Sequence, residues 1–182
     1  MIEGTLVNLR APDMDDLERN TRWVNDREVT RYLVLRYQMP GLAEENWLRE
    51  RCSSAPSYHN TFFAIETKDG RHIGNTNLFN ASPENRSAEA GIMIGDKEYW
   101  ARGFGTDAMR TLLGFGFGEM NLHRVHLIVY AFNERAQAAY RKCGYREEAR
   151  LRQHIFREGA YHDVVVMSIL RGEFYTEGEA AP

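Results

Sequence analysis

The fold is decided by residues 87–130, which read SAEAGIMIGDKEYWARGFGTDAMRTLLGFGFGEMNLHRVHLIVY. Residues 124–130 are a short β-branched run typical of a central strand, and 87–94 indicates another strand. Between them, 104–120 has the length of a helix. Two strands joined through a crossover helix in one sheet run parallel, so this unit predicts a parallel pair.

Antiparallel hairpins are predicted on both sides of this unit. Strands at 61–67 and 72–79 flank Lys68-Asp69-Gly70-Arg71, where Asp-Gly supplies the positive φ angles of a tight turn. Two last strands are expected at about 146–156 and 160–170. The sheet is therefore predicted to be mixed and mostly antiparallel.

The N-terminal part combines one strand with helices. Residues 5–10 read as a short strand, and Asp13 is a good N-cap for the helix that follows. Asp26 can cap a second short helical turn, and 42–52 indicates a further helix. The predicted order is β-α-α-β-β-β-α-β-α-β-β, an α+β fold with helices on both faces of the sheet.

Length and composition limit the classes of protein to which the chain can belong. The chain has 182 residues, 43% hydrophobic and 27% charged, which fits one globular domain. We assign that domain to residues 1–175 and expect the small, polar tail 176–182 to be disordered. A net charge of −3 argues against nucleic acid as a partner.

The expected compartment is the cytoplasm. Cys52 and Cys143 are too few for a disulfide framework and suit a reducing environment. No window reaches the roughly 18 apolar residues of a membrane span, so no membrane partner is expected.

The segment 99–108, YWARGFGTDA, indicates an anion site between a strand and a helix. Gly103 and Gly105 allow close approach of the backbone to a ligand, and the N–H groups of about 103–107 point outward at the start of the helix. Arg102 adds a positive charge. A ligand-free turn is the alternative, and the spacing fits neither a P-loop nor a dinucleotide fingerprint.

The segment 133–145, NERAQAAYRKCGY, is the second informative stretch. Asn133 ends a strand and caps a helix that stops at Gly144, a suitable C-terminal glycine. Tyr140 lies two turns along this helix. If the preceding strand splays from its neighbour, Asn133 and Tyr140 flank the opening.

These two segments resemble the acetyl-CoA motifs of the GNAT superfamily of N-acetyltransferases, in the branch of the ribosomal-protein N-terminal and spermidine acetyltransferases. The first is similar to that branch's YWGKGYGTEA pyrophosphate loop, and the second to its N-E-x-A-x-x-x-Y-x-K-x-G-F/Y helix. The resemblance spans about residues 5–172. Trp100 departs from the superfamily's Gln/Arg at the first loop position, as is common in this branch.

The resemblance implies a single-domain GNAT-like fold and acetyl-CoA as cosubstrate. It implies a bulge in the third strand of the meander, whose backbone binds the pantetheine arm and polarises the thioester carbonyl. It places Asn133 against the pantetheine or cysteamine region and Tyr140 near the sulfur. The cofactor-binding residues implied are Ile92, Met93, Ile94, Arg102, Gly103, Phe104, Gly105, Thr106, Asn133, Ala136 and Tyr140.

Acetyl transfer to an amine needs a base for the amine proton and an acid for the leaving thiolate. Tyr140 is the candidate acid, and packing of its ring is the alternative. Glu89, on the strand of the expected oxyanion donors, is the candidate base, and a merely solvated carboxylate is the alternative. No metal site is predicted, since His123 and His126 point to opposite faces of their strand.

The predicted function is acetyl-CoA-dependent N-acetylation of a primary amine in a ternary complex. The acceptor is left open between a protein N-terminus, a polyamine and another small amine. The alternative is a non-catalytic CoA-binding or regulatory module on the same fold. A homodimer through the last strands or helices fits this type of protein.

Overall fold

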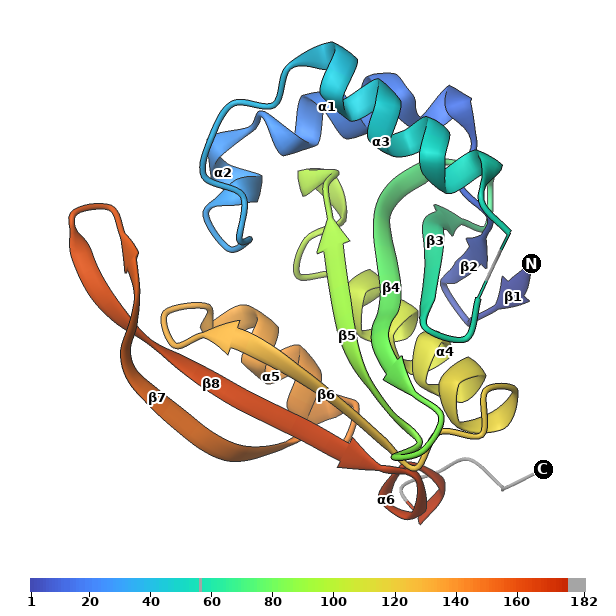
Figure 1. Ribbon diagram of the computed structural model, residues 1–182, viewed down its shortest axis with the longest axis vertical. Helices are drawn as coiled ribbons and strands as arrows, with labels where there is room; N and C mark the ends of the chain where they lie inside the picture. Colours follow the sequence, from blue (N-terminus) through green and yellow to red (C-terminus); the bar gives the residue numbers. More distant parts are fainter. Residues whose placement is uncertain (56, 177–182) are drawn as a thin grey trace.

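In the computed structural model, which describes residues 1–55 and 57–176, eight strands form one sheet with helices on both faces (Figure 1). The strands are β1 Ile2–Glu3, β2 Val7–Arg10, β3 Asn60–Thr67, β4 His72–Ser82, β5 Ser87–Ile94, β6 Arg124–Tyr130, β7 Arg146–Arg157 and β8 Ala160–Leu170. The helices are η1 Met14–Asp16, α1 Leu17–Val24, α2 Arg27–Thr30, α3 Gly41–Ser53, η2 Lys97–Tyr99, α4 Phe104–Gly118, α5 Glu134–Lys142 and α6 Arg171–Thr176.

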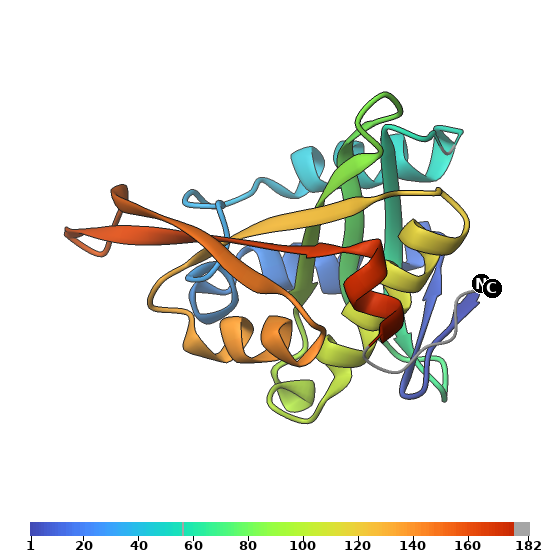
Figure 2. The same cartoon turned by 90° about the horizontal axis from the view of Figure 1, so that it is seen from below.

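The strand order confirms the predicted mixed sheet. Neighbours follow the order β1-β2-β3-β4-β5-β6-β8-β7, and of the pairs in this sheet β5–β6 is the parallel one. Helix α4 makes the crossover between these two strands. The long β7–β8 hairpin extends beyond the rest of the sheet (Figure 2).

The parallel pairing of β5 and β6 is short. It covers Ser87–Arg124, Ala88–Val125 and Glu89–His126, after which the two strands part (Figure 1). Strand β6 then continues along β8 as far as Tyr130. The backbone of β5 beyond Glu89 therefore lacks a strand partner on its β6 side.

The bulge expected at Ile92–Ile94 is not present. The pairing of β4 with β5 runs without interruption from Gly74–Ile94 to Phe79–Glu89. The extra residue lies in β4 instead, between Phe79 and Ser82, which also makes β4 longer than the predicted 72–79. The β6-facing edge of β5 is exposed because β6 diverges from it, and not because β5 carries an inserted residue.

The main hydrophobic core lies between the sheet and α4. Leu78, Ala88 and Val125 are fully buried in it. A Cβ added to Gly116 of α4 would lie 3.0 Å from Leu78 Cδ1, so this glycine lets the helix approach the sheet closely. The largest fully buried side chains are Phe117, Leu9, Leu48, Ile65, Ile73, Leu78, Met109, Leu112, Leu113, Leu122, Leu127 and Met167.

Helices α1 and α3 cover the other face of the sheet (Figure 1). The predicted Asp13 cap begins η1, which leads directly into α1, and it forms a capping box with Asp16. Asp16 is 2% exposed and binds Arg10 at 2.7 Å and His72 Nδ1 at 3.0 Å. This polar cluster joins α1 to β2 and β4.

Two element boundaries and one strand differ from prediction. The first strand starts at Val7 rather than residue 5, and β1 was not predicted. Asp107 of α4 accepts the N–H groups of Thr5, Leu6 and Val7, at 3.2, 2.7 and 3.0 Å, and so holds this hairpin. Helix α4 ends at Gly118 rather than residue 120.

Helix α6 was also missed. Its Phe174 packs on Phe117 with ring centroids 5.4 Å apart. Thr176, predicted to begin the disordered tail, ends this helix instead. The remaining tail residues, 177–182, lie outside the described part of the chain. No described helix is both long and apolar enough to cross a bilayer.

We expect Asp16→Asn to lower the free energy of unfolding by roughly 1.5–3 kcal/mol, because it removes the buried carboxylate that binds Arg10 and His72, while Glu66 still binds Arg10. Burial alone would raise the pKa of Asp16, but His72 and Arg10 hold it well below its ordinary value of 3.8. Chemical denaturation measures the change, with exposed Asp15→Asn as the matched control, expected within about 0.5 kcal/mol of the parent.

The same ion cluster predicts a dependence on pH. Because the pKa of Asp16 is lower in the folded chain than in the unfolded one, its contribution is complete above about pH 4 and is lost on acidification. Stability of the parent should therefore fall more steeply than that of Asp16→Asn below about pH 4. Parallel slopes would contradict this role.

Candidate active site

The loop before α4 presents a row of free backbone donors. The N–H groups of residues 101–106 find no acceptor within residues 1–55 and 57–176, whereas the Asp107 N–H donates to the Gly103 carbonyl at 2.9 Å. The row of free N–H groups therefore begins at residue 101 and ends at residue 106, whereas the prediction was 103–107. Ala101 (φ +57°) and Gly103 (φ +91°) are left-handed, which turns consecutive N–H groups toward one point. This arrangement suits a phosphate or diphosphate.

Arg102 lies at the edge of this loop, as predicted. Its Nη1 donates to the Glu98 carbonyl at 3.1 Å, and its guanidinium lies 5.7 Å and 5.8 Å from the ring centres of Tyr99 and Phe104. The side chain is exposed. Its positive charge is thus available beside the row of N–H groups, with no carboxylate bound to it in the described residues.

The loop lies at the open end of the gap between β5 and β6. A Cβ added to Gly105 would lie 3.5 Å from Ile94 Cγ1. The indole Nε1 of Trp100 donates to the Ile94 carbonyl at 2.6 Å. Ile92, Met93 and Ile94 are each half-buried along this edge. The structure therefore brings the predicted loop and strand residues together around one slot.

Helix α5 borders the slot from the β6 side. Asn133 caps it, with Oδ1 accepting the Ala136 N–H at 3.2 Å. The Cys143 thiol donates to the Thr106 carbonyl at 3.5 Å and so ties the end of α5 to the start of α4. Cys143 is buried, which raises its pKa to about 12 and argues against a nucleophilic role.

Tyr140 lies on α5 against the core, its ring centre 5.8 Å from that of Tyr145. Burial raises the pKa of the Tyr140 hydroxyl well above its ordinary value of 10.0. The hydroxyl makes no hydrogen bond to any described residue. It is therefore a protonated donor without a partner inside the chain.

Glu89 occupies the opposite face of the sheet. Its strand neighbours Ala88 and Ala90 belong to the core on the α4 side, so the Glu89 side chain points away from α4. It is half-buried, and Asn80 Nδ2 donates to its Oε2 at a long 3.5 Å. The candidate acid and the candidate base therefore lie on different faces of the sheet.

Sequence reasoning missed a stacked cluster across the slot. The Arg135 guanidinium lies 3.9 Å from the Trp100 ring centre and 5.5 Å from that of Tyr32. Arg135 belongs to the α5 motif, but the motif does not predict this contact. The partners of Arg135 come from other parts of the chain, namely Trp100 from the loop before α4 and Tyr32 from the N-terminal half.

A second missed residue is Arg157 at the tip of the β7–β8 hairpin. Its Nη2 donates to the carbonyls of Thr30, Leu33 and Leu35, at 2.7 Å for Thr30 and 2.8 Å for Leu35. The hairpin thus holds the loop that follows α2. No short motif predicts this contact, because its partners are more than 120 residues apart.

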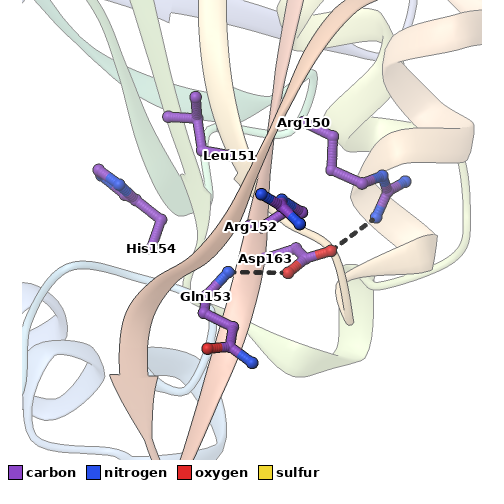
Figure 3. A pocket seen from close by; sticks show the side chains of 6 residues that line it. All are labelled: Arg150, Leu151, Arg152, Gln153, His154 and Asp163. Carbon is purple, nitrogen blue, oxygen red and sulfur yellow. Dashed lines mark hydrogen bonds and ion pairs between the residues drawn. The ribbon is translucent and has the colours of Figure 1, made fainter.

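A separate hollow lies on the β7–β8 hairpin (Figure 3). It is a wide, open depression of about 730 Å³. Asp163 accepts the Gln153 N–H at 2.9 Å and lies 3.8 Å from Arg150. None of the predicted site residues lines it. Among the described residues, no group of three or more His, Cys, Asp or Glu side chains is placed to hold a metal ion.

Comparison with known proteins agrees with this geometry. Residues 7–146 match the family described as "Acetyltransferase (GNAT) domain". The Bacillus subtilis protein YdaF, whose name places it among ribosomal N-acetyltransferases, is 36% identical over 111 residues, which are 61% of this chain and 59% of YdaF. The chain thus spans about three fifths of the length of that curated relative. The spermidine N(1)-acetyltransferase of Vibrio cholerae is 32% identical over 117 residues, 64% of this chain and 67% of the relative.

The fold is also similar to solved structures. The crystal structure of spermidine N-acetyltransferase from Vibrio cholerae in complex with CoA and spermine superposes with a TM-score of 0.84 at 27% identity. The match covers 93% of this chain and 98% of that one.

Proposed function

Because the chain belongs to the GNAT acetyltransferase family, we propose that it transfers the acetyl group of acetyl-CoA to a primary amine. The observation that carries this proposal is the row of free N–H groups at 101–106, located at the open end of the β5–β6 slot. The Vibrio cholerae relative with the same fold binds CoA, which supports it.

The proposed binding mode starts from the diphosphate on this loop, beside Arg102. The pantetheine arm then follows β5 from Ile94 toward Glu89, a distance of about 16 Å for five residues of strand. There the arm takes the place of the missing strand partner on the β6 side of Ile92, Met93 and Ile94, with the Ile94 carbonyl already bound to Trp100. Asn133 and Ala136 border it from α5.

The proposed chemistry is direct attack in a ternary complex. The neutral amine attacks the thioester carbon, and N–H groups of β5 stabilise the oxyanion that forms. The C–S bond then breaks, and Tyr140 gives its proton to the sulfur. The transfer is uphill for a phenol, and burial raises the pKa of Tyr140 further, so it depends on a hydrogen bond from the Tyr140 hydroxyl to the sulfur as the C–S bond breaks.

The charges near the slot bear on the acceptor. Lys97 Nζ lies 2.9 Å from Asp26 and 2.8 Å from Glu28, and Arg31 lies 3.0 Å from Glu158. These carboxylates are therefore already paired with cations. A polyamine would need several unpaired carboxylates, so we propose an acceptor with a single reactive amine, such as a protein N-terminus or a small monoamine.

Assembly and compartment are part of the proposal. Strand β7 lies at the edge of the sheet and is exposed along most of its length, which suits a homodimer. Both cysteines are free thiols, which suits the cytoplasm.

We expect Gly105→Leu to weaken CoA binding at least about tenfold, because the new side chain occupies the path of the diphosphate and arm beside Ile94. Isothermal calorimetry with CoA measures this. Gly114→Leu, in the same helix with open space around its Cβ position, is the matched control and should bind CoA as the parent does. Equal affinity of both variants would contradict the assigned diphosphate site.

We expect Tyr140→Phe to lower kcat by about 10²-fold with little change in the KM of acetyl-CoA, because it removes the general acid and leaves the ring in place. Steady-state release of free thiol gives both constants. A kcat equal to that of the parent would remove Tyr140 from the mechanism.

In the same thiol assay, we expect a panel of primary amines to be acetylated without preference for spermidine. Spermidine and a monoamine of similar length should give kcat/KM values within about tenfold of each other. A much larger preference for spermidine would contradict the single-amine acceptor. Tight CoA binding without thiol release for any amine, including peptide N-termini, would favour the non-catalytic CoA-binding module.

A further inference from the structure

The corner where β5 and β6 part carries a second titratable side chain. Glu89 and His126 are the last residues in register before the strands separate. Residues directly opposite each other on neighbouring strands share a face, so the His126 side chain lies on the open face with that of Glu89. Val125 and Leu127, which flank His126, point into the core on the α4 side.

Hydrogen bonds in this corner leave His126 without a partner. Arg124 Nη1 donates to Glu148 Oε1 at 2.7 Å and to Ser168 Oγ at 2.9 Å, and Arg124 Nη2 donates to Glu148 Oε2. The half-buried imidazole of His126 makes no hydrogen bond to any described residue. Both of its ring nitrogens are therefore free to accept or donate a proton.

The second carboxylate of this corner, that of Glu148, is bound to Arg124. Hydrogen bonds from Arg124 and Ser168 hold the pKa of Glu148 at about 2, and the nearby His126 contributes to the same lowering. Glu148 is thus ionised and bound to Arg124, which makes it a poor base. The titratable and charged groups that face His126 are Glu89 of β5, Arg124 of β6, and Arg146 and Glu148 of β7.

We propose that His126 is the general base that removes the proton from the attacking amine, with the Glu89 carboxylate beside the same nitrogen. This inference rests on the proposed function, because the pantetheine arm along β5 delivers the thioester to this corner. The amine reaches the thioester from the open face, while Tyr140 lies behind the sheet with α5.

Bonds and protons balance in this step. The amine nitrogen forms the C–N bond with its lone pair, and one N–H proton passes to a ring nitrogen of His126. The C–S bond breaks with its electron pair going to sulfur, and the proton of Tyr140 completes the free thiol. His126 then releases its proton to solvent, and Tyr140 regains one from solvent.

The test compares three variants of the full chain in the thiol-release assay. We expect His126→Gln and His126→Ala to lower kcat by about 10²–10³-fold with an unchanged KM for acetyl-CoA. Added imidazole should restore a measurable part of the rate to His126→Ala only. His123→Gln, at an exposed histidine that precedes the same strand, is the matched control and should keep the parent kcat.

The pH profile supplies a readout that a structural role would not change. A base must be neutral to accept the proton, so kcat of the parent should fall on acidification, when protonated His126 accumulates. With a weakly basic amine, which stays neutral over the pH range of the assay, this acidic limb should be present in the parent and in His123→Gln. It should be absent from His126→Gln.

Two outcomes would overturn the proposal while leaving the function intact. One is a parent that turns over while His126→Gln keeps its kcat and its acidic limb. The other is a loss of rate in both His126 variants with a lower melting temperature and no response to imidazole, which would make the residue structural. A parent that binds CoA without acetylating any amine would instead contradict the proposed function.

Discussion

The structure depends on the parting of β5 from β6 after three paired residues. A central strand normally satisfies its backbone groups on both sides, but β5 is paired along its length only with β4. Strand β6 pairs instead with β8 over its whole length. The unpaired side of β5 is therefore a ready-made partner for an extended, amide-bearing ligand. Because α4 makes the crossover between these strands, its free N-terminal donors lie at the open end of the same gap.

The two faces of the sheet give the slot two chemical environments. On the α4 and α5 side, packing buries Tyr140 and raises its pKa, which stabilises the protonated phenol. On the other side, Glu89 and His126 stand half-buried beside the Arg124–Glu148 pair. A thioester lying in the gap meets proton acceptors from one face and a proton donor from the other. The direction of proton flow follows from this asymmetry.

Local chemistry made much of the fold predictable from sequence. The Asp69-Gly70 turn, the Asp13 cap and the Asn133 cap each require only neighbouring residues, and the structure has all three, although in the turn the positive φ angle is at Gly70 and not at Asp69. Helix α6 and strand β1 were not predictable in this way, because Phe117 and Asp107, far away in the chain, hold them.

Which parts of the site the sequence predicted also depended on whether they rest on local or on distant contacts. The donors before α4 were found because glycine spacing and a helix start are local signals. The pairing of Glu89 with His126 was not, because it depends on the register of a parallel pair formed across the α4 crossover. The bulge implied for β5 was wrong for a related reason, since the register with β4 is also set by tertiary packing.

The rim of the slot is held with unequal strength at its two sides. On the hairpin side, Arg157 donates to backbone carbonyls of the loop after α2, and the Tyr130 hydroxyl donates to the Leu33 carbonyl at 3.1 Å. Hydrogen bonds from a charged group contribute about 1.5–3 kcal/mol each. On the α5 side, the end of the helix is tied to α4 through Cys143 and Arg110, whereas its start meets the loop before α4 through the stacking of Arg135 on Trp100, worth about 0.5–2 kcal/mol. This stacking contact therefore yields at lower cost than the Arg157 hydrogen bonds to a ligand that enters beside the donors of α4, and a displaced Arg135 guanidinium there meets the negative charge of the diphosphate.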